Sequence, residues 1–473
     1  MPRQAERPRR MRPPLGLAAR RRLAPTQARL VAARVLERVE TARAYANLAL
    51  QAELGRASLG ARDRAFATEL VYGTLRWRGR LDFLLGHATD RPLAELEPGV
   101  RTLLRLGAYQ ILFCDSVPTA AAVDQTVRSA RVLGASRAAG LVNAVLRRMA
   151  QRATEIPLPT LADDPLAHLE HALALPRWLA ERWLADYGSA EAAALAEASN
   201  AVPPLTARAN LGRTSRDALL AKVRARFPDA RACDFAPAGV VLGHGGQPGA
   251  DPAFVEGLFT VQDEASQLVA ELLDPQPGER VLDACAAPGT KTTAIAERVG
   301  PGGLVVATDR SERRLALVGR AARRLGLENV TALRRDAAKP LRDLPGAPFD
   351  RVLVDAPCSG LGTLRRNPDA RWRLTPEAPA SLAATQAALL ASAAAVLRPG
   401  GTLVYSTCTL LHEENEAVVA DFLARERGFV PADPETLPAC ARRVLDAEGR
   451  LRTFPHRHGM DGFFAARLER RPA

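Results

Sequence analysis

The chain lacks most of the features that mark membrane, secreted or metal-binding proteins. No run approaches 18 apolar residues, so we expect no membrane-spanning helix. No apolar stretch with a small-residue cleavage site follows the charged N-terminus, which argues against a secretory signal. The six cysteines show neither CxxC nor Cys/His metal spacing, so we expect no metal, free thiols and a reducing, cytoplasmic location.

Lysine is also scarce: the chain has three lysines within a combined Lys and Arg total of 65. A high-GC coding bias explains most of the Arg excess, but it does not create the formal net charge of +13. That charge fits a polyanionic partner. With 473 residues, 47% of them hydrophobic, the chain is long enough for about two to four domains with real cores.

The hydrophobic pattern changes along the chain and predicts its organisation. Residues 1–23 hold eight Arg and one Glu without periodicity and are expected to be a basic disordered tail. Residues 24–150 are predicted to be a helical domain, 151–164 a polar linker, and 165–256 a small connecting domain of helices and short strands. In residues 257–473, strand, loop and helix repeat, which predicts a parallel sheet with covering helices.

In the helical region, apolar residues recur at three-to-four spacing between Pro and Gly breakers. A basic cluster, Arg76, Arg78 and Arg80, surrounds Trp77 and could hold phosphates and stack a base. The alternative, which the pattern alone favours, is a solvated helix end with Trp77 in the core. The predicted helices are 28–39, 65–75, 81–85, 100–113, 120–133 and 138–149, followed in the connecting domain by 177–187 and 190–199.

A loop of small residues follows the first strand predicted in the repeating region. The strand covers 279–283, the loop 284–289 and the next helix 290–299. Such a loop lets the backbone approach a ligand, and the helix N-terminus favours negative groups. The loop is neither GxGxxG nor a P-loop. Lys291, just inside the helix, could pair with a cofactor carboxylate.

Acidic residues end three successive predicted strands: Asp283, Asp309 and Asp336. A carboxylate at the end of the second strand is well placed to accept both ribose hydroxyls of a nucleoside cofactor. Asp336 could meet the adenine amino group. Either residue alone could instead be a helix N-cap, Asp309 before Ser311 and Asp336 before a short helix. Their recurrence at successive strand ends favours the ligand interpretation.

Two cysteines, Cys358 and Cys408, end two further strands, and Asp355 lies beside the first. A thiolate at the carboxyl edge of a parallel sheet can attack an electron-poor ring, and a nearby carboxylate can bind a ring nitrogen. Methylation of cytosine carbon 5 needs a thiolate on carbon 6, an acid near nitrogen 3 and a second base. Both thiols could reach such a base. Three other cysteines, Cys114, Cys233 and Cys440, are expected to be buried small hydrophobes.

The motifs in these segments resemble those of the RNA cytosine-5 methyltransferase family, which uses S-adenosyl-L-methionine. They are VQDEASQL (261–268), DACAAPGTKT (283–292), DAPCSGLGTLRRNPD (355–369), LVYSTCT (403–409) and DGFFAARL (461–468). The stretch DRAFATELVYGTLRWRGRLD (63–82) resembles the NusB-like RNA-binding domain. A NusB-like domain before this catalytic unit is similar to bacterial 16S rRNA methyltransferases, and the resemblance covers roughly residues 24–469.

The resemblance implies roles for individual residues. Cys408 would be the nucleophile, and Cys358 would assist product release. The role of Asp355 at the cytosine ring nitrogen is expected from the chemistry of the reaction, whereas the resemblance places Asp355 among the cofactor contacts. One departure from the family pattern is Thr290, where Gly is usual. The implied cofactor contacts are Cys285, Ala286, Ala287, Pro288, Gly289, Thr290, Lys291, Asp309, Arg310, Asp336 and Asp355. The expected RNA contacts are Arg76, Arg78, Arg80, Arg365 and Arg366.

The sequence thus predicts a multidomain protein. We expect an all-α NusB-like domain, a small α/β connecting domain, and a Rossmann-like class I methyltransferase domain with a seven-stranded sheet. The expected activity is methylation of one cytosine in 16S rRNA or a small-subunit precursor by a monomer. The alternatives are a tRNA cytosine-5 methyltransferase, a non-catalytic rRNA-binding assembly factor and, more weakly, a DNA methyltransferase.

Overall fold

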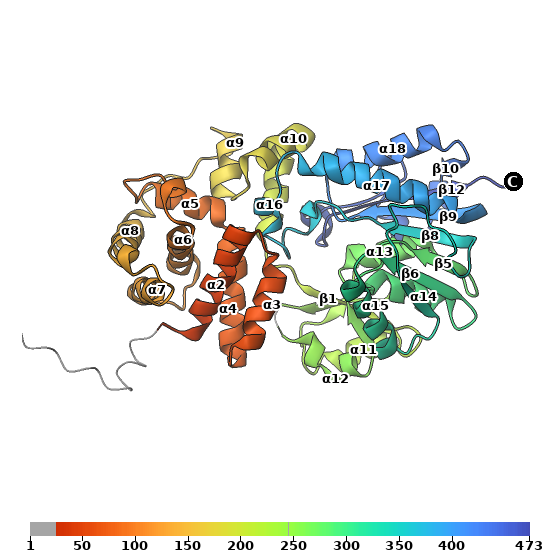
Figure 1. Cartoon of the computed structure of the whole chain (residues 1–473), viewed down its shortest axis with the longest axis horizontal. Helices are drawn as coiled ribbons and strands as arrows, with labels where there is room; N and C mark the ends of the chain where they lie inside the picture. Colours follow the sequence, from red (N-terminus) through yellow and green to blue (C-terminus); the bar gives the residue numbers. More distant parts are fainter. Residues whose placement is uncertain (1–24, 245) are drawn as a thin grey trace, which may run out of the picture. The chain divides into compact units, whose positions relative to one another are not determined.

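The computed structural model describes residues 25–244 and 246–473, so the predicted basic tail lies outside the described residues. The chain forms two compact units, one ending at Ala174 and one beginning at Leu175. Figure 1 shows the helices and strands of both units.

The first unit is helical, as predicted. Its core consists of leucines, valines and alanines at three-to-four spacing, among them the fully buried Leu70, Leu81 and Leu104. The six predicted helices are present, while α3 was missed because it buries only four residues and its apolar stripe is short. Its helices are α2 (Gln27–Ala42), α3 (Ala46–Arg56), α4 (Ala61–Arg76), α5 (Arg78–Gly86), α6 (Pro98–Phe113), α7 (Thr119–Val132), α8 (Ala139–Arg152) and the short α9 (Pro165–Ala167).

The second unit begins with α10 (Arg177–Asn200), whose two halves meet at Gly188 with a φ of 75°. That left-handed residue explains why the pattern predicted two helices. A small antiparallel sheet follows, in the order β2-β3-β1-β4. Its strands are β1 (Leu205–Ala209), β2 (Arg231–Ala232), β3 (Gly239–Gly243) and β4 (Phe259–Val261), with α11 (Arg216–Val223) and α12 (Pro252–Val255) between them.

The larger sheet of this unit has the strand order β10-β12-β9-β8-β5-β6-β7, and β11 pairs with β12 off this path. The five strands from β9 to β7 in this order run parallel, while β12 and β10 are antiparallel additions at one edge. The strands are β5 (Arg280–Asp283), β6 (Leu304–Asp309), β7 (Val330–Arg334), β8 (Phe349–Asp355), β9 (Leu397–Thr407), β10 (Phe429–Pro431), β11 (Leu451–Thr453) and β12 (Phe463–Arg470).

Both faces of this sheet are buried, because successive strand residues point to opposite sides. Leu282 belongs to the core under α17 (Ala378–Ala395) and α18 (Glu416–Arg425), whereas its neighbour Val281 belongs to the core under α13 (Glu264–Leu273) and α14 (Thr290–Val299). Figure 1 shows these two helical layers on either side of the strands. The parallel register brings the ends of β5, β6, β8 and β9 to one edge, where the candidate site lies.

By length and composition, α17 is long and apolar enough to cross a membrane, although its sequence holds no uninterrupted run of 18 apolar residues. The helix instead has a place in the sheet core. Its residues Leu389, Leu390, Ala393 and Ala394 are buried in the cluster that contains β8 and β9.

Candidate active site

The two predicted thiols lie next to each other at the carboxyl edge of the large sheet. Cys358 follows β8 and Cys408 follows β9, and their Sγ atoms are 3.3 Å apart. The backbone N–H of Cys408 also donates to the Sγ of Cys358, at 3.3 Å. Parallel pairing of Asp355 with Ser406 sets this geometry, because it brings two strand ends 50 residues apart in sequence to the same height.

The surroundings of Cys358 favour its neutral form. The pKa of its thiol is raised well above the usual value, first by the hydrogen bond with Cys408, then by burial, and by the nearby charges of Cys408 and Glu414. Since Cys358 keeps its proton and accepts from the Cys408 backbone, its S–H can donate to the Cys408 sulfur. This arrangement provides one proton-carrying thiol beside a second sulfur.

Asp355 is held by two neighbours and keeps part of its surface open. Its Oδ2 accepts from Lys291 Nζ at 2.7 Å, and its Oδ1 accepts from Ser406 Oγ at 2.9 Å. The Asp355 side chain is 30% exposed, which leaves room for a ligand, whereas Lys291 is 7% exposed. The sequence predicted that Lys291 pairs with a cofactor carboxylate, and in the structure it pairs with the Asp355 carboxylate. Lys291 orients Asp355, with its ammonium group also 5.1 Å from the centre of the Phe463 ring.

The small-residue loop forms a tight connection from β5 into α14. Gly289 has a φ of 108°, and a Cβ there would lie 3.0 Å from the Val318 backbone, so this position requires glycine. The Ala286 N–H donates to the Thr308 carbonyl at 2.8 Å, and Arg314 donates to the Ala287 carbonyl at 2.7 Å. These bonds fix a tight turn beside the helix N-terminus. Thr290 is the first residue of α14 and is half-buried, and Cys285 and Pro288 lie in the same turn with partly or fully exposed surfaces.

The strand-end acids take different positions. Asp283 is fully buried, its Oδ2 accepts from Thr292 Oγ1 at 2.7 Å, and burial raises its pKa to about 7. Asp283 therefore points into the protein, and the expectation that it belongs to a series of ligand-facing acids is wrong. Asp309 is 6% exposed and accepts from the Ser311 N–H at 2.8 Å, while Asp336 is exposed.

Neither Asp309 nor Asp336 starts a helix. The N-cap of α15 (Glu312–Leu325) is Ser311, whose Oγ accepts from the Arg314 N–H. Asp336 accepts from the Ala338 N–H at 3.2 Å in a turn, rather than preceding the expected short helix. This edge has features that suit a nucleoside cofactor. A turn that requires glycine follows β5, and Asp309 ends β6 with a carboxylate whose Oδ2 lies 3.8 Å from Arg314. Arg310, next to Asp309, is exposed.

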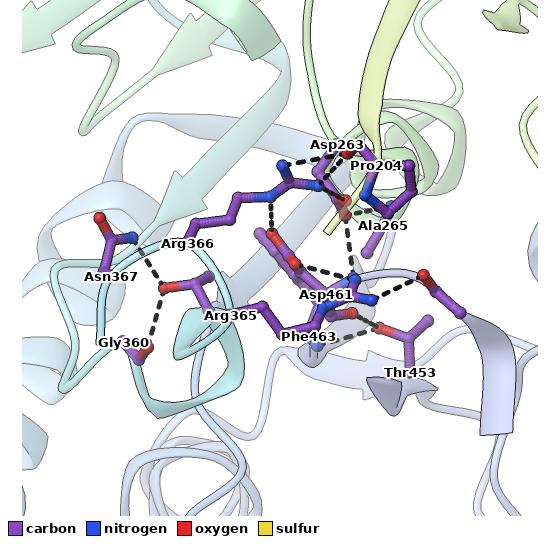
Figure 2. Close-up of polar contacts among 12 residues, drawn as sticks. Pro204, Asp263, Ala265, Gly360, Arg365, Arg366, Asn367, Thr453, Asp461 and Phe463 are labelled. Atoms are coloured by element: carbon purple, nitrogen blue, oxygen red, sulfur yellow. Dashed lines mark hydrogen bonds and ion pairs between the residues drawn. The ribbon is translucent and has the colours of Figure 1, made fainter. Parts of the chain in front are cut away.

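The structure does not support the predicted RNA contacts of Arg365 and Arg366. Figure 2 shows both guanidinium groups turned toward Asp461. Arg365 is 5% exposed and bonds Asp461 Oδ1 at 3.1 Å, while Arg366 bonds Asp461 Oδ2 at 2.7 Å and Asp263 Oδ2 at 2.8 Å. A buried charge needs a partner of opposite sign. These arginines therefore tie the loop after Cys358 to β12 and to the start of α13.

This position predicts an effect on stability rather than on RNA affinity. In Arg366→Met, two buried carboxylates lose their shared partner, and we expect the free energy of unfolding to fall by about 3–5 kcal/mol. Arg425→Met is the control, since its exposed pair with Asp421 should be worth less than about 1 kcal/mol. Denaturant unfolding measures both. A lower salt dependence of RNA binding with unchanged stability would contradict this assignment.

The three arginines of the first unit that were predicted to bind RNA also lie against other residues of the protein. Arg76 is 8% exposed. Arg78 pairs with Glu40 at 3.1 Å, and the same carboxylate holds Arg101 and Arg105. Arg80 lies over the Trp77 ring at 5.7 Å, and Trp77 stacks on Phe113 at 5.0 Å. Trp77 packs against the core, as the simpler interpretation of this segment expected.

Sequence reasoning missed two buried polar residues near the thiols, Glu414 and Asn415, both 0% exposed. They lie between the last residue of β9 and α18 and bond both thiol-bearing loops. A signal was available, because an acid and an amide stand side by side six and seven residues after Cys408, directly before an apolar helix.

Models of known families match three parts of the chain. The model described as 16S rRNA methyltransferase RsmB/F matches residues 270–469, the NusB family matches residues 26–151, and the ferredoxin-like domain of RsmF/B-like methyltransferases matches residues 175–247. The predicted fold class is thereby confirmed, and the connecting domain is a ferredoxin-like one.

Relatives extend the similarity over nearly the whole chain. The "probable ribosomal RNA small subunit methyltransferase B" of Synechocystis is 39% identical over 94% of this chain and 99% of its own length. Ribosomal RNA small subunit methyltransferase B of Pseudomonas putida is 38% identical over 93% of this chain and 98% of its own. The crystal structure of PH0851 is 28% identical, has a TM-score of 0.76, and covers 94% of this chain and 99% of that one.

Proposed function

Since this chain belongs to the 16S rRNA methyltransferase RsmB/F family, we propose that it methylates carbon 5 of one cytosine in 16S rRNA through a covalent Cys408–RNA adduct. As a member of this family the protein is an S-adenosyl-L-methionine-dependent rRNA methyltransferase. The cofactor supplies an electrophilic methyl group. The proposal adds the atom that receives the methyl group and the covalent route.

The observation that carries the proposal is the pair of thiols 3.3 Å apart beside Asp355. Carbon 5 of cytosine is a weak nucleophile until a sulfur adds to carbon 6. The reaction then needs a group at nitrogen 3 and a base that removes the carbon-5 proton. Cys408 supplies the sulfur, and Asp355 faces nitrogen 3. Cys358 holds its proton before the reaction, so it first gives that proton to solvent, and its sulfur then accepts the carbon-5 proton as the bond between Cys408 and carbon 6 breaks. Methylation of an exocyclic amine or a ribose hydroxyl needs no such pair of thiols.

The tight turn of residues 285–291 and the acids Asp309 and Asp336 would hold the cofactor, with Asp309 on the ribose hydroxyls. A hydrogen bond to a charged group contributes about 1.5–3 kcal/mol. We therefore expect Asp309→Ala to weaken S-adenosyl-L-methionine binding by about tenfold to a hundredfold, measured by titration calorimetry. Glu312→Ala, which removes an exposed carboxylate three residues away, should bind normally. Equal affinity of Asp309→Ala and wild type would refute the ribose contact.

Sequencing of bisulfite-treated 16S rRNA tests the proposed product. A strain lacking the gene should lose one protected cytosine, and the wild-type gene should restore it, whereas Cys408→Ala should not. Loss of a methyl group from a ribose or an exocyclic amine, with every 5-methylcytosine retained, would reject the proposal. Loss of a protected cytosine in tRNA alone would favour the tRNA alternative, against which the NusB match argues. An assembly factor without catalysis would leave all protected positions unchanged.

We further propose that the helical unit contributes most of the rRNA affinity. Residues 175–473 produced alone should bind the cofactor normally but bind 16S rRNA more weakly and with a smaller dependence on salt, because fewer phosphates are neutralised. Filter binding at several salt concentrations measures both quantities. Methylation of the same cytosine at the same rate and RNA concentration as by the full chain would argue against a recognition role for the first unit.

A further inference from the structure

Glu414 and Asn415 are two adjacent buried polar residues that bond the loops carrying the two thiols. Glu414 ends the short turn His412–Glu414, and Asn415 directly precedes α18. Both side chains are 0% exposed, so their hydrogen bonds form away from solvent, where leaving a polar group unpaired is costly. The Tyr405 hydroxyl donates to the Glu414 carbonyl at 2.6 Å and attaches this pair of residues to β9.

Glu414 holds the loop that carries Cys358. Its Oε2 accepts from the Ser359 N–H at 2.9 Å and from Gln386 Nε2 at 3.0 Å. The same Gln386 amide donates to the Pro357 carbonyl at 3.0 Å. The residues on both sides of Cys358 are therefore tied to Glu414, one directly and the other through Gln386.

Asn415 holds the loop that carries Cys408 in the same way. Its Oδ1 accepts from Thr407 Oγ1 at 2.5 Å, and its Nδ2 donates to the Thr409 carbonyl at 3.1 Å. These two residues lie on either side of Cys408. A bond of 2.7 Å between the hydroxyls of Ser359 and Thr409 then joins the two loops to each other.

We propose that Glu414 and Asn415 are positioning residues that set the separation and aim of the two thiols, Glu414 through the Cys358 loop and Asn415 through the Cys408 loop. The hydrogen bonds of both side chains go to the residues that flank the cysteines and not to the sulfur atoms, although the nearby charge of Glu414 also helps to raise the pKa of Cys358. Each acts on the backbone that flanks one cysteine, and displacement of a reacting group by about 1 Å can cost on the order of a hundredfold in rate. This inference rests on the proposed function, because it assigns the two cysteines to separate steps.

The separate attachments predict that the two variants fail at different steps. Asn415→Ala should slow adduct formation by about tenfold to a hundredfold, because the Cys408 sulfur is no longer held in position to attack carbon 6. This variant should accumulate no covalent complex. Glu414→Ala should form the adduct at nearly the normal rate but release product about tenfold to a hundredfold more slowly, and so should accumulate the complex. Single-turnover reactions with transcribed 16S rRNA and S-adenosyl-L-methionine, sampled on denaturing gels, measure both rates.

Several variants separate positioning from simple destabilisation. Glu414→Gln keeps a carbonyl oxygen that can accept from the Ser359 N–H. Burial raises the pKa of Glu414 and so favours its neutral form, which the glutamine resembles. The release rate of this variant should therefore be within about threefold of wild type. Glu413→Ala is the matched control, since Glu413 is the neighbouring acid and its carboxylate pairs with Arg182 and not with the cysteine loops. If either alanine variant fails to fold, two other variants replace them. Thr407→Val removes the one bond from Thr407 to Asn415, and Gln386→Leu removes the two bonds from Gln386 to Glu414 and to the Pro357 carbonyl. Each should shift the same step in the same direction as the alanine variant of its partner.

The proposal is overturned if both alanine variants, folded and with normal cofactor affinity, slow the two steps equally or leave both unchanged. Cys408→Ala and Cys358→Ala run alongside to test the underlying mechanism. If they fail to separate adduct formation from release, the proposed function is wrong. If they separate the two steps and the Glu414 and Asn415 variants do not, the positioning role alone is wrong.

Discussion

Cys408→Ala is expected to abolish methylation, with no product above background and no covalent protein–RNA complex. The sulfur of Cys408 is the group that adds to carbon 6, and alanine offers no nucleophile. Cys408 is half-buried just after β9 and packs only at the margin of a core cluster, so its replacement by the smaller alanine should disturb the core little. Methyl transfer from labelled S-adenosyl-L-methionine to 16S rRNA measures the activity, and the denaturing gel detects the adduct.

Two controls identify the reason for the loss. Cofactor affinity of Cys408→Ala should equal that of wild type, which would exclude a collapsed site. Cys440→Ala, which removes a partly buried thiol near Glu271, should retain activity. Near-normal methylation by Cys408→Ala would mean that Cys408 is a structural cysteine and would remove the basis of the covalent mechanism.

Cys358→Ala is expected to stall after methyl transfer. Cys408 can still attack, but release of the methylated base slows because the neighbouring thiol no longer assists the step. The protein should then remain attached to its RNA and migrate as a slow band on a denaturing gel. Loss of the S–H beside Cys408 removes the group whose sulfur lies 3.3 Å away, so the effect should be large.

The double variant, with both cysteines replaced by alanine, should show no slow band, because formation of the adduct requires Cys408. The reverse pattern would exchange the two roles: a trapped complex in Cys408→Ala and complete inactivity in Cys358→Ala would make Cys358 the nucleophile. Modest loss of stability with near-normal activity in both single variants would indicate two buried structural cysteines instead.

Local patterns in the sequence were sufficient for the elements of the site. Short apolar runs that end in polar loops predicted β5, β6, β8 and β9, and the parallel arrangement followed from the helices between them. Because parallel strands end at one edge, the residues after each strand had to meet there. The meeting of Cys358, Cys408 and Asp355 was therefore predictable from strand ends alone, without any knowledge of distances.

The errors share a cause: sequence gives the charge of a side chain but not its partner. Arg365 and Arg366 were expected to bind phosphates as a basic pair, yet Asp461, 95 or 96 residues later, bonds both, and Asp263 provides the second negative charge. Asp283 read as a ligand acid like Asp309, but it is fully buried and bonds Thr292. Burial and pairing depend on the packing of segments that are distant in sequence.

The sequence by itself determined the fold class, the three-part organisation and the identity of the reactive groups, because these depend on short-range periodicity and on residue type at strand ends. Only the tertiary structure decided which charges are free to meet a ligand and how the thiols are held. Lys291 orients Asp355 from 64 residues away, and Glu414 reaches back 55 residues to Ser359. Such contacts depend on β8 pairing with β5 and β9 and on the packing of the segments between them, which local sequence patterns do not encode.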